Sequence, residues 1–248
     1  MHVRVAVKYL AVVGLALMLG ACATVESPDE TDPFESANRT AYGFNDGLDR
    51  AFFKPVATAY ANVTPDPVRD SVTNFFNNVS YLNVLLNDIL QGKIGQFVQD
   101  SGRFVVNSTI GIGGLFDPAT SMGMARHNED LGQTFGTWGA GEGAYLVLPF
   151  VGPNSFRDLP DIATSTLLNP LTYLNAVVTI PLNIVNLINT RANFLEATDF
   201  VDQAAIDPYT FVRESYRQSR EFQIYDGNPP EDEYEQYIEE DGGVLKVF

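Results

Sequence analysis

The chain is poor in the side chains that most metal sites and hydrolases need. It holds one cysteine, Cys22, and two histidines, His2 and His127. A multi-histidine or cysteine-rich zinc site therefore cannot be assembled. A single cysteine also leaves no partner for a disulfide within the chain. We expect no metal, no cofactor and no disulfide.

Motifs for nucleophilic and nucleotide chemistry are missing as well. The nucleophile elbow G-x-S-x-G does not occur, and a Ser-His-Asp triad would need His127 as its base. His127 lies in RHNED, residues 126–130, which is either an acid–base cluster or, as we favour, an exposed loop. The glycine-rich residues 132–143 contain no lysine and no G-K-[ST], so we expect no phosphate-binding loop there. The sequence indicates a protein that is not an enzyme.

Basic residues are scarce. The chain has 15 Lys and Arg against 31 Asp and Glu, a formal net charge of −16. Nucleic-acid binding depends on a basic surface, and so does electrostatic binding to anionic lipid. We expect no nucleic-acid partner, and any contact with a membrane must rest on acyl chains and apolar burial.

The apolar run near the start is too short to span a membrane. It covers eleven residues, Tyr9 to Leu19, after the cations Arg4 and Lys8, whereas a spanning helix needs about 20. Such a run is typical of a secretion signal. The residues that follow, Leu19-Gly20-Ala21-Cys22, resemble a bacterial lipobox, in which the cysteine sulfur receives diacylglycerol and the chain is cleaved before it. The alternative is a plain signal peptide with an incidental cysteine.

The lipobox divides the chain. Residues 1–21 would be a lipoprotein signal peptide, and Cys22 the lipid attachment site, with palmitate among its acyl chains. Ala23 follows the cysteine instead of an aspartate, which by resemblance favours sorting to the outer membrane. Residues 22–33 form an acidic linker, residues 34–225 a helical domain, and residues 226–248 an acidic tail that composition predicts to be disordered.

Hydrophobic periodicity predicts a mainly α domain. From Phe34 onward, apolar residues recur on one helical face; they are Ala37, Ala41, Phe44, Leu48 and Phe52. Asp66-Pro67 opens a second helix, whose buried side we expect at Val68, Val72, Phe75 and Phe76. Further helices are predicted over 80–90 and 93–108, and from about 160 to 222. Residues 132–152 are expected to form a glycine-rich loop or hairpin with a short strand over 145–148.

The stretch Ile162–Thr190 has no formal charge in 29 residues. Its polar side chains recur at spacings of 3, 4, 4, 3 and 4; they are Thr172, Asn175, Thr179, Asn183, Asn186 and Thr190. On a helix they fall within an arc of about 80°, and apolar residues fill most of the remaining surface. A thin neutral stripe in a broad apolar wrap favours a helix buried in lipid, with the stripe lining a partly wet cavity. The alternative is a core helix of a soluble bundle.

Three positions near this stretch leave alternatives open. Pro181 either kinks one helix or starts a second. Arg191 is placed where a cation snorkelling to a membrane surface is expected. Arg213, Arg217 and Arg220 share one helical face, which meets either a lipid headgroup layer or partner surface, or solvent with Glu214 and Glu221 as local partners.

Five blocks in this order resemble the MlaA/VacJ lipoprotein family. They are DPFESANRTAYGFNDGLDRAFFKPVATAY (32–60), FVVNSTIGIGGLFDPA (104–119), EDLGQTFGTWGAGEGAYLVLPFVGPNSFRD (129–158), NTRANFLE (189–196) and DPYTFVRESYRQSREF (207–222). The resemblance covers nearly all of residues 32–225. This sequence departs from the family pattern in the linker, the acidic tail and the helix composition around 162–186.

The resemblance implies a Gram-negative outer-membrane lipoprotein without enzymatic activity. It implies a single ring-like domain of amphipathic helices, largely in the membrane plane of the inner leaflet, around an amphipathic channel. Implied partners are phospholipid, trimeric porins and a periplasmic lipid-shuttle protein of the Mla pathway. The implied function is removal of mislocalised phospholipids from the outer leaflet, which maintains lipid asymmetry by intermembrane phospholipid transport.

Two site hypotheses follow. Asn175, Thr179, Asn183, Asn186 and Thr190 line part of the channel. Gly136, Gly139, Gly141 and Gly143 belong to a flexible hairpin that adjusts the channel opening. The alternatives are a structural, porin-associated lipoprotein without a transport path, and a lipid hydrolase that uses His127.

Overall fold

The computed structural model describes residues 32–230. The signal peptide 1–21, the attachment site Cys22 and the linker up to residue 31 lie outside the described residues. The tail beyond residue 230 lies outside them too. The assignments made for these segments from the sequence therefore stay predictions.

The described chain is mainly helical, with one short hairpin. Its first half contains α2 (Glu35–Leu48), a π-helical turn (Asp49–Phe53), α3 (Lys54–Val63), α4 (Asp66–Leu90), α5 (Ile94–Thr109) and α6 (Pro118–Ser121). Its second half contains α7 (Leu131–Thr137), β1 (Tyr145–Leu148), β2 (Gly152–Ser155), α8 (Leu159–Leu168), a 3-10 turn (Pro170–Tyr173), α9 (Ala176–Asn193), α10 (Leu195–Ala204) and α11 (Pro208–Ile224). The prediction of a mainly α single domain is confirmed.

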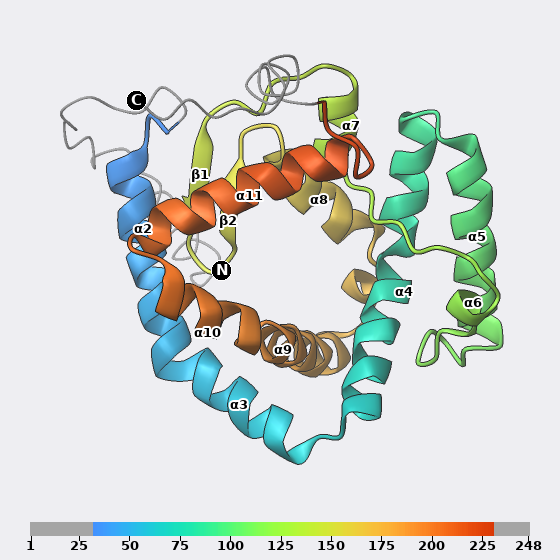
Figure 1. Ribbon diagram of the computed structural model, residues 1–248. Coiled ribbons are helices and arrows are strands. Elements are labelled where there is room, and N and C mark those ends of the chain that lie inside the picture. The colour runs from blue at the N-terminus through green and yellow to red at the C-terminus, as the bar shows by residue number, and fades with distance from the viewer. Residues whose placement is uncertain (1–31, 231–248) are drawn as a thin grey trace, which may run out of the picture.

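The elements are arranged as a ring (Figure 1). Helices α2, α3 and α4 follow one another around three sides, while α11, α8 and the β hairpin close the fourth. Helices α5 and α6 lie outside the ring; α5 packs against α4, and α6 packs against α5. Helix α9 is viewed almost along its axis, so it runs through the thickness of the ring instead of around it.

Two details of the helix prediction are wrong. Helix α4 is continuous over 25 residues, where separate helices were expected before and after residue 80. Polar residues in the middle of this helix have partners: Asn78 donates to Ser108 Oγ and Ser80 donates to the Phe76 carbonyl. Val68, expected on the buried side, is 50% exposed, and of that set only Phe76 is buried.

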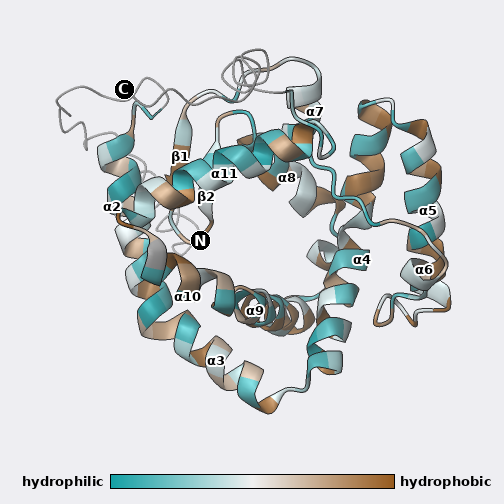
Figure 2. Ribbon diagram, in the orientation of Figure 1, coloured by the Kyte–Doolittle hydropathy of each residue, from teal (hydrophilic) through white to brown (hydrophobic). Residues whose placement is uncertain are grey.

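The distribution of polar and apolar residues is the reverse of that in a water-soluble domain. Among the described residues, 17 buried residues are polar or charged and only 10 are hydrophobic. Large hydrophobic residues are exposed on almost every element, for example Phe44 on α2, Val98 on α5 and Ile180 on α9. Figure 2 shows them spread around the ring instead of gathered on one inner side. A soluble protein would lose hydrophobic stabilisation by this arrangement, whereas in lipid exposed apolar residues carry no such cost.

Within residues 32–230, no helix combines the length and the apolar character that crossing a membrane requires. The small core that exists lies where the hairpin meets α2 and α11. It consists of Tyr145, Val147 and Tyr209, with Tyr42 and Tyr216 packed against it.

The hairpin is antiparallel and pairs Tyr145 with Ser155 and Leu148 with Gly152. The strand predicted over 145–148 is therefore confirmed. Most of the glycine-rich segment before it is not a hairpin: residues 131–137 form α7, because Asp130 caps this helix by accepting a hydrogen bond from the Gln133 amide at 2.8 Å. Gly136 thus lies in a helix.

Candidate functional site

The predicted polar stripe is divided between local capping and an exposed helix face. Asn175 is the N-cap of α9, and its side chain accepts a hydrogen bond from the Val177 amide at 3.0 Å. The Thr179 hydroxyl donates to the Leu171 carbonyl at 2.9 Å. Thr172 lies in the preceding 3-10 turn, so it does not share the helix. The Asn175 cap and the bond from Thr179 to the preceding turn explain why these polar residues stand at the start of α9.

The other stripe residues lie along the body of α9. Asn183 and Thr190 are exposed and Asn186 is half-buried. Pro181 lies inside this single helix, which decides between the two alternatives left open by the sequence. Figure 1 places α9 between α3, on which it packs, and the centre of the ring. Beside the polar residues, Ile180 and Ile184 are more than half exposed, so the free side of α9 combines amides with apolar surface.

Two residues at the end of α9 fix the helix to its neighbours. Asn189 is 1% exposed; its amide donates to Thr73 Oγ1 on α4 at 2.8 Å and its carbonyl accepts from the Tyr60 hydroxyl on α3 at 2.9 Å. Arg191 forms a two-pronged ion pair with Asp49, at 2.7 and 2.8 Å. The expectation that Arg191 snorkels to a membrane surface is wrong, because its guanidinium is engaged inside the protein.

The arginines of α11 also point into the protein scaffold. Arg213 contacts the fully buried Asp32 at 3.3 Å, which fixes the start of the domain to α11. Arg220 forms two bonds with Asp130, at 2.6 and 2.8 Å, and one with Asp158 at 3.0 Å. Burial alone would raise the pKa of Asp130, but the hydrogen bonds and charge of Arg220 lower it below its usual value. Arg213 and Arg220 therefore do not lie on a solvent-exposed face, although Arg213 does pair with Glu214, the local partner that one alternative named.

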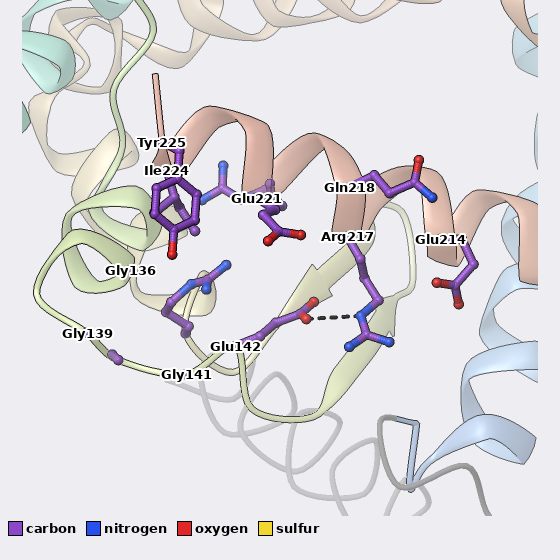
Figure 3. A pocket seen from close by; sticks show the side chains of 13 residues that line it. Gly136, Gly139, Gly141, Glu142, Glu214, Arg217, Gln218, Glu221, Ile224 and Tyr225 are labelled. Carbon is purple, nitrogen blue, oxygen red and sulfur yellow. Dashed lines mark hydrogen bonds and ion pairs between the residues drawn. The ribbon is translucent and has the colours of Figure 1, made fainter. Parts of the chain in front are cut away.

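Arg217 has a different partner, on the glycine-rich loop. Its Nε donates to Glu142 Oε2 at 3.1 Å, as the dashed line in Figure 3 shows. Gly139 and Gly143 on either side of Glu142 have φ of 89° and 70°, a backbone conformation that side chains disfavour. Of the four glycines assigned to a flexible hairpin, Gly139, Gly141 and Gly143 lie in this loop, which leads into β1.

The loop and α11 enclose a cavity of about 520 Å³ (Figure 3). We call it the α11 pocket. Its lining consists of Gly136, Gly139, Ala140, Gly141, Glu142, Arg157, Glu214, Arg217, Gln218, Arg220, Glu221, Ile224 and Tyr225. This volume is within the range of small-molecule sites.

A second polar cluster lies where α4 and α5 meet the loop before α7. Asp88 and Asp100 are fully buried and Glu129 is 5% exposed. Gln96 donates to Asp88 at 2.9 Å and to Glu129 at 2.7 Å, and His127 Nδ1 lies 2.9 Å from Asp100. Burial and the nearby charges of Asp100 and Glu129 raise the pKa of Asp88 to about 7.

This cluster has the geometry of a structural network. The buried Asp100 fixes the position of the His127 ring. No group of three or more His, Cys, Asp or Glu side chains in residues 32–230 is arranged to hold a metal ion. The RHNED segment leads from α6 into α7, and because Glu129 is buried it is not the exposed loop that the sequence favoured.

The Asp88 pKa predicts a pH-dependent stability. In the folded state the carboxyl binds its proton more tightly than in the unfolded chain, so the free energy of unfolding should fall as pH rises from about 4 to 7. Asp88→Asn keeps the acceptor for Gln96 and removes the charge. We expect this variant to melt about 5 °C higher than the wild type at pH 8 and equally at pH 4, measured by circular dichroism in detergent. The same change at the exposed Asp70 of α4 is the control; a gain of equal size there would contradict the assignment.

Sequence reasoning missed the buried polar residues that hold the ring together. Asn38 on α2 pairs with both the Tyr145 carbonyl and the Val147 amide of β1, at 2.9 and 2.8 Å. Arg103 on α5 is 2% exposed and bonds to α4 and α6. A signal was present on α5, where the residues that share a face with Arg103 are polar and buried, whereas Val98 and Val105 are exposed.

Comparison with known proteins gives consistent matches over the described domain. The family model described as MlaA lipoprotein matches residues 30–223. A protein of Rickettsia bellii (strain RML369-C), named only as uncharacterized, is 36% identical over 195 residues, which cover 78% of this chain and 76% of that one. The intermembrane phospholipid transport system lipoprotein MlaA of Escherichia coli (strain K12) is 32% identical over 238 residues, covering 92% of this chain and 93% of that protein.

The Shigella flexneri protein of the same name is 33% identical with the same coverage. A solved structure reported as "Structural basis for maintenance of bacterial outer membrane lipid asymmetry" is similar in fold. It has a TM-score of 0.70 and 33% sequence identity, and it covers 79% of this chain and all of its own.

Proposed function

This chain belongs to the MlaA lipoprotein family, and we propose that it removes mislocalised phospholipids from the outer leaflet of the outer membrane and passes them to a periplasmic carrier. The observation that carries the proposal is the reversed distribution of residues, with polar groups buried and apolar ones exposed around a ring. A protein of this kind is stable when lipid surrounds it. The family acts in intermembrane phospholipid transport, and its location is the outer membrane.

The proposed position is the inner leaflet, where Cys22 carries the lipid anchor. Two or more acyl chains on one residue hold a protein stably, since each buried CH₂ contributes about 0.8 kcal/mol. The ring then lies in one lipid layer. A trimeric porin is the proposed neighbour in the membrane.

The proposed path for lipid runs along the free side of α9. A headgroup that crosses hydrocarbon loses its hydration, and neutral amides and hydroxyls compensate part of that loss without the desolvation cost of ions. Asn183, Asn186 and Thr190 supply such groups, and Ile180 and Ile184 beside them suit acyl chains. Asn175 supports this face by capping α9, and Thr179 by fixing the helix to the preceding turn. A passive path works in both directions, so the direction of net transport must come from an energy source elsewhere.

Loss and rescue of lipid asymmetry tests the function. A Gram-negative strain that lacks its own copy should accumulate phospholipid in the outer leaflet, and the wild-type gene should restore the normal low level. Cys22→Ala, which removes the attachment site, should fail to restore this low level, and the variant should be absent from the outer-membrane fraction. If the wild-type gene changes nothing in the null strain, the proposal is wrong.

The stripe itself is tested by replacing Asn183 and Asn186 together with leucine. Leucine matches asparagine closely in size and favours helix, so α9 should persist while its neutral groups are lost. We expect at least tenfold slower removal of outer-leaflet phospholipid with unchanged membrane localisation. Ile180→Leu and Ile184→Leu on the same face form the matched control. Full activity of the asparagine variant would favour a structural, porin-associated role without a transport path.

A further inference from the structure

The α11 pocket carries guanidinium groups with unused hydrogen-bonding capacity. Arg220 is fully engaged by Asp130, Asp158 and Gln223. Arg157 and Arg217 differ, because each uses only its Nε, toward Asp158 and Glu142 respectively. Their terminal nitrogens have no hydrogen-bond partner among the described residues. Two neighbouring arginines with free terminal N–H groups are suited to bind phosphate oxygens.

The same pocket carries carboxylates with unused acceptors. Glu142 Oε1 is buried and has no hydrogen-bond partner, whereas Oε2 accepts from Arg217. Glu221 is exposed and its side chain makes no hydrogen bond within the described chain. Figure 3 shows Glu221 on α11 above Glu142 on the loop, with Arg217 beside them. Positive and negative groups thus face one cavity without neutralising one another fully.

A ligand for such a pocket must carry both charges. The lining holds three arginines and three glutamates. A simple anion would be repelled by the glutamates and a simple cation by the arginines, whereas a zwitterion satisfies both sets. A phosphoethanolamine group has a phosphate and an ammonium a few bonds apart, and it is small compared with the 520 Å³ of the cavity.

We propose that the α11 pocket binds the zwitterionic headgroup of a phospholipid, with the phosphate on Arg157 and Arg217 and the ammonium on Glu142 and Glu221. This inference rests on the proposed function and names the class of lipid it handles. The end of the pocket is apolar: Ile224 and Tyr225 line it, and Phe222 nearby is 55% exposed. That edge suits the start of the acyl chains. The loop 139–142 forms the other wall, so occupancy of the pocket and position of the loop are linked.

The test is calorimetric titration of the full-length lipoprotein in detergent with glycerophosphoethanolamine, the water-soluble headgroup. We expect saturable binding, and binding at least tenfold weaker for inorganic phosphate, glycerol 3-phosphate and ethanolamine, because each lacks one charge or the other. Arg217→Gln and Glu221→Gln should each weaken the binding of glycerophosphoethanolamine at least tenfold, as expected for loss of one charge-assisted hydrogen bond. Glu221→Gln is the safer variant for folding, because Glu221 has no protein partner to lose.

The control is Arg50→Gln, which removes an exposed arginine paired with Asp46 and Asp202 outside the pocket; it should bind like the wild type. If the wild type bound inorganic phosphate as tightly as glycerophosphoethanolamine, the pocket would be an anion site only, and the proposal would be overturned. Absence of headgroup binding by the wild type would also overturn it. The measurement of lipid asymmetry distinguishes failure of this inference from failure of the proposed function. If the wild-type gene rescues the null strain while the protein binds no headgroup, only this inference fails; if rescue fails, the proposed function fails.

Discussion

Replacing Arg103 with methionine should lower the free energy of unfolding by about 3–5 kcal/mol, the usual cost of removing one member of a buried ion pair. Arg103 joins three elements. Its Nε donates to the Tyr81 hydroxyl on α4 at 2.7 Å, and Nη1 donates to Thr120 Oγ1 at 2.9 Å and to the Met124 carbonyl at 2.6 Å. Nη2 pairs with Asp117. Methionine fills similar volume, but it takes away the hydrogen-bond donor of the buried Tyr81 hydroxyl and the cation that pairs with Asp117.

We expect the Arg103 variant to unfold first around α5 and α6, before the rest of the domain unfolds. Helices α5 and α6 lie outside the ring, and α6 depends on Asp117, which caps it through the Thr120 amide at 3.1 Å. Thermal unfolding in detergent should show a midpoint about 10 °C lower, and limited proteolysis should cut residues 110–130 first. Arg50→Met is the matched control. Its ion pairs are exposed, so a change of no more than about 1 kcal/mol is expected. Equal losses in the two variants would contradict the role given to Arg103.

Gly132→Ala should lower the free energy of unfolding by a similar amount, about 3 kcal/mol, although it adds only one methyl group. A Cβ at this position would lie 2.2 Å from Asp158 Oδ1 and 2.7 Å from Arg220 Nη2. Neither side chain can move freely, because Asp158 is held by Arg157 and Arg220 and is buried. The methyl must therefore break the network that joins α7, α8 and α11.

Gly43→Ala is the control for this prediction. Gly43 also lies inside a helix, α2, but a Cβ there meets no atom within 4 Å. Since alanine restricts the unfolded chain and favours helix, this variant should gain about 0.5–1 kcal/mol. Two identical substitutions should thus shift the melting temperature in opposite directions. A fall of the same size at Gly43 would show that α helices of this protein simply tolerate no alanine, and the argument from Asp158 would be lost.

Both predictions follow from one property of the fold, which is that polar contacts hold the ring together. Asn38, Arg103, Asn189 and Arg220 each join elements that are distant in the sequence. Where lipid surrounds a protein, apolar surfaces gain little by packing on one another, and hydrogen bonds inside become the specific contacts. Single polar substitutions should therefore cost more here than most exposed apolar ones.

Helix content and several helix ends were predictable from the sequence because they depend on local contacts. Asp66-Pro67 marks the start of α4, and Gly92 separates α4 from α5, as their positions imply. The continuity of α4 through Asn77 and Asn78 was not predictable. Asn78 has Ser108 as its partner, 30 residues further along the chain, and local propensity contains no information about that contact.

The candidate sites divide in the same way. The stripe on α9 is visible in the spacing of Asn183, Asn186 and Thr190, because a helix fixes which residues share a face. That Asn175 caps the helix, and that Arg191 pairs with Asp49, depends on neighbours that periodicity does not identify. The α11 pocket combines Arg157, Glu142 and Arg217 from separate segments, so no single motif announces it.

By itself the sequence determined the scarcity of cysteine and histidine, the helical class, and the resemblance that indicates the family. Only the tertiary structure decided which face of each helix is buried, with Asn38 and Arg103 inside and Phe44 and Val98 exposed. The physical reason is that periodicity defines a face relative to its own helix axis. Whether that face meets lipid, water or another helix depends on contacts between residues far apart in the chain.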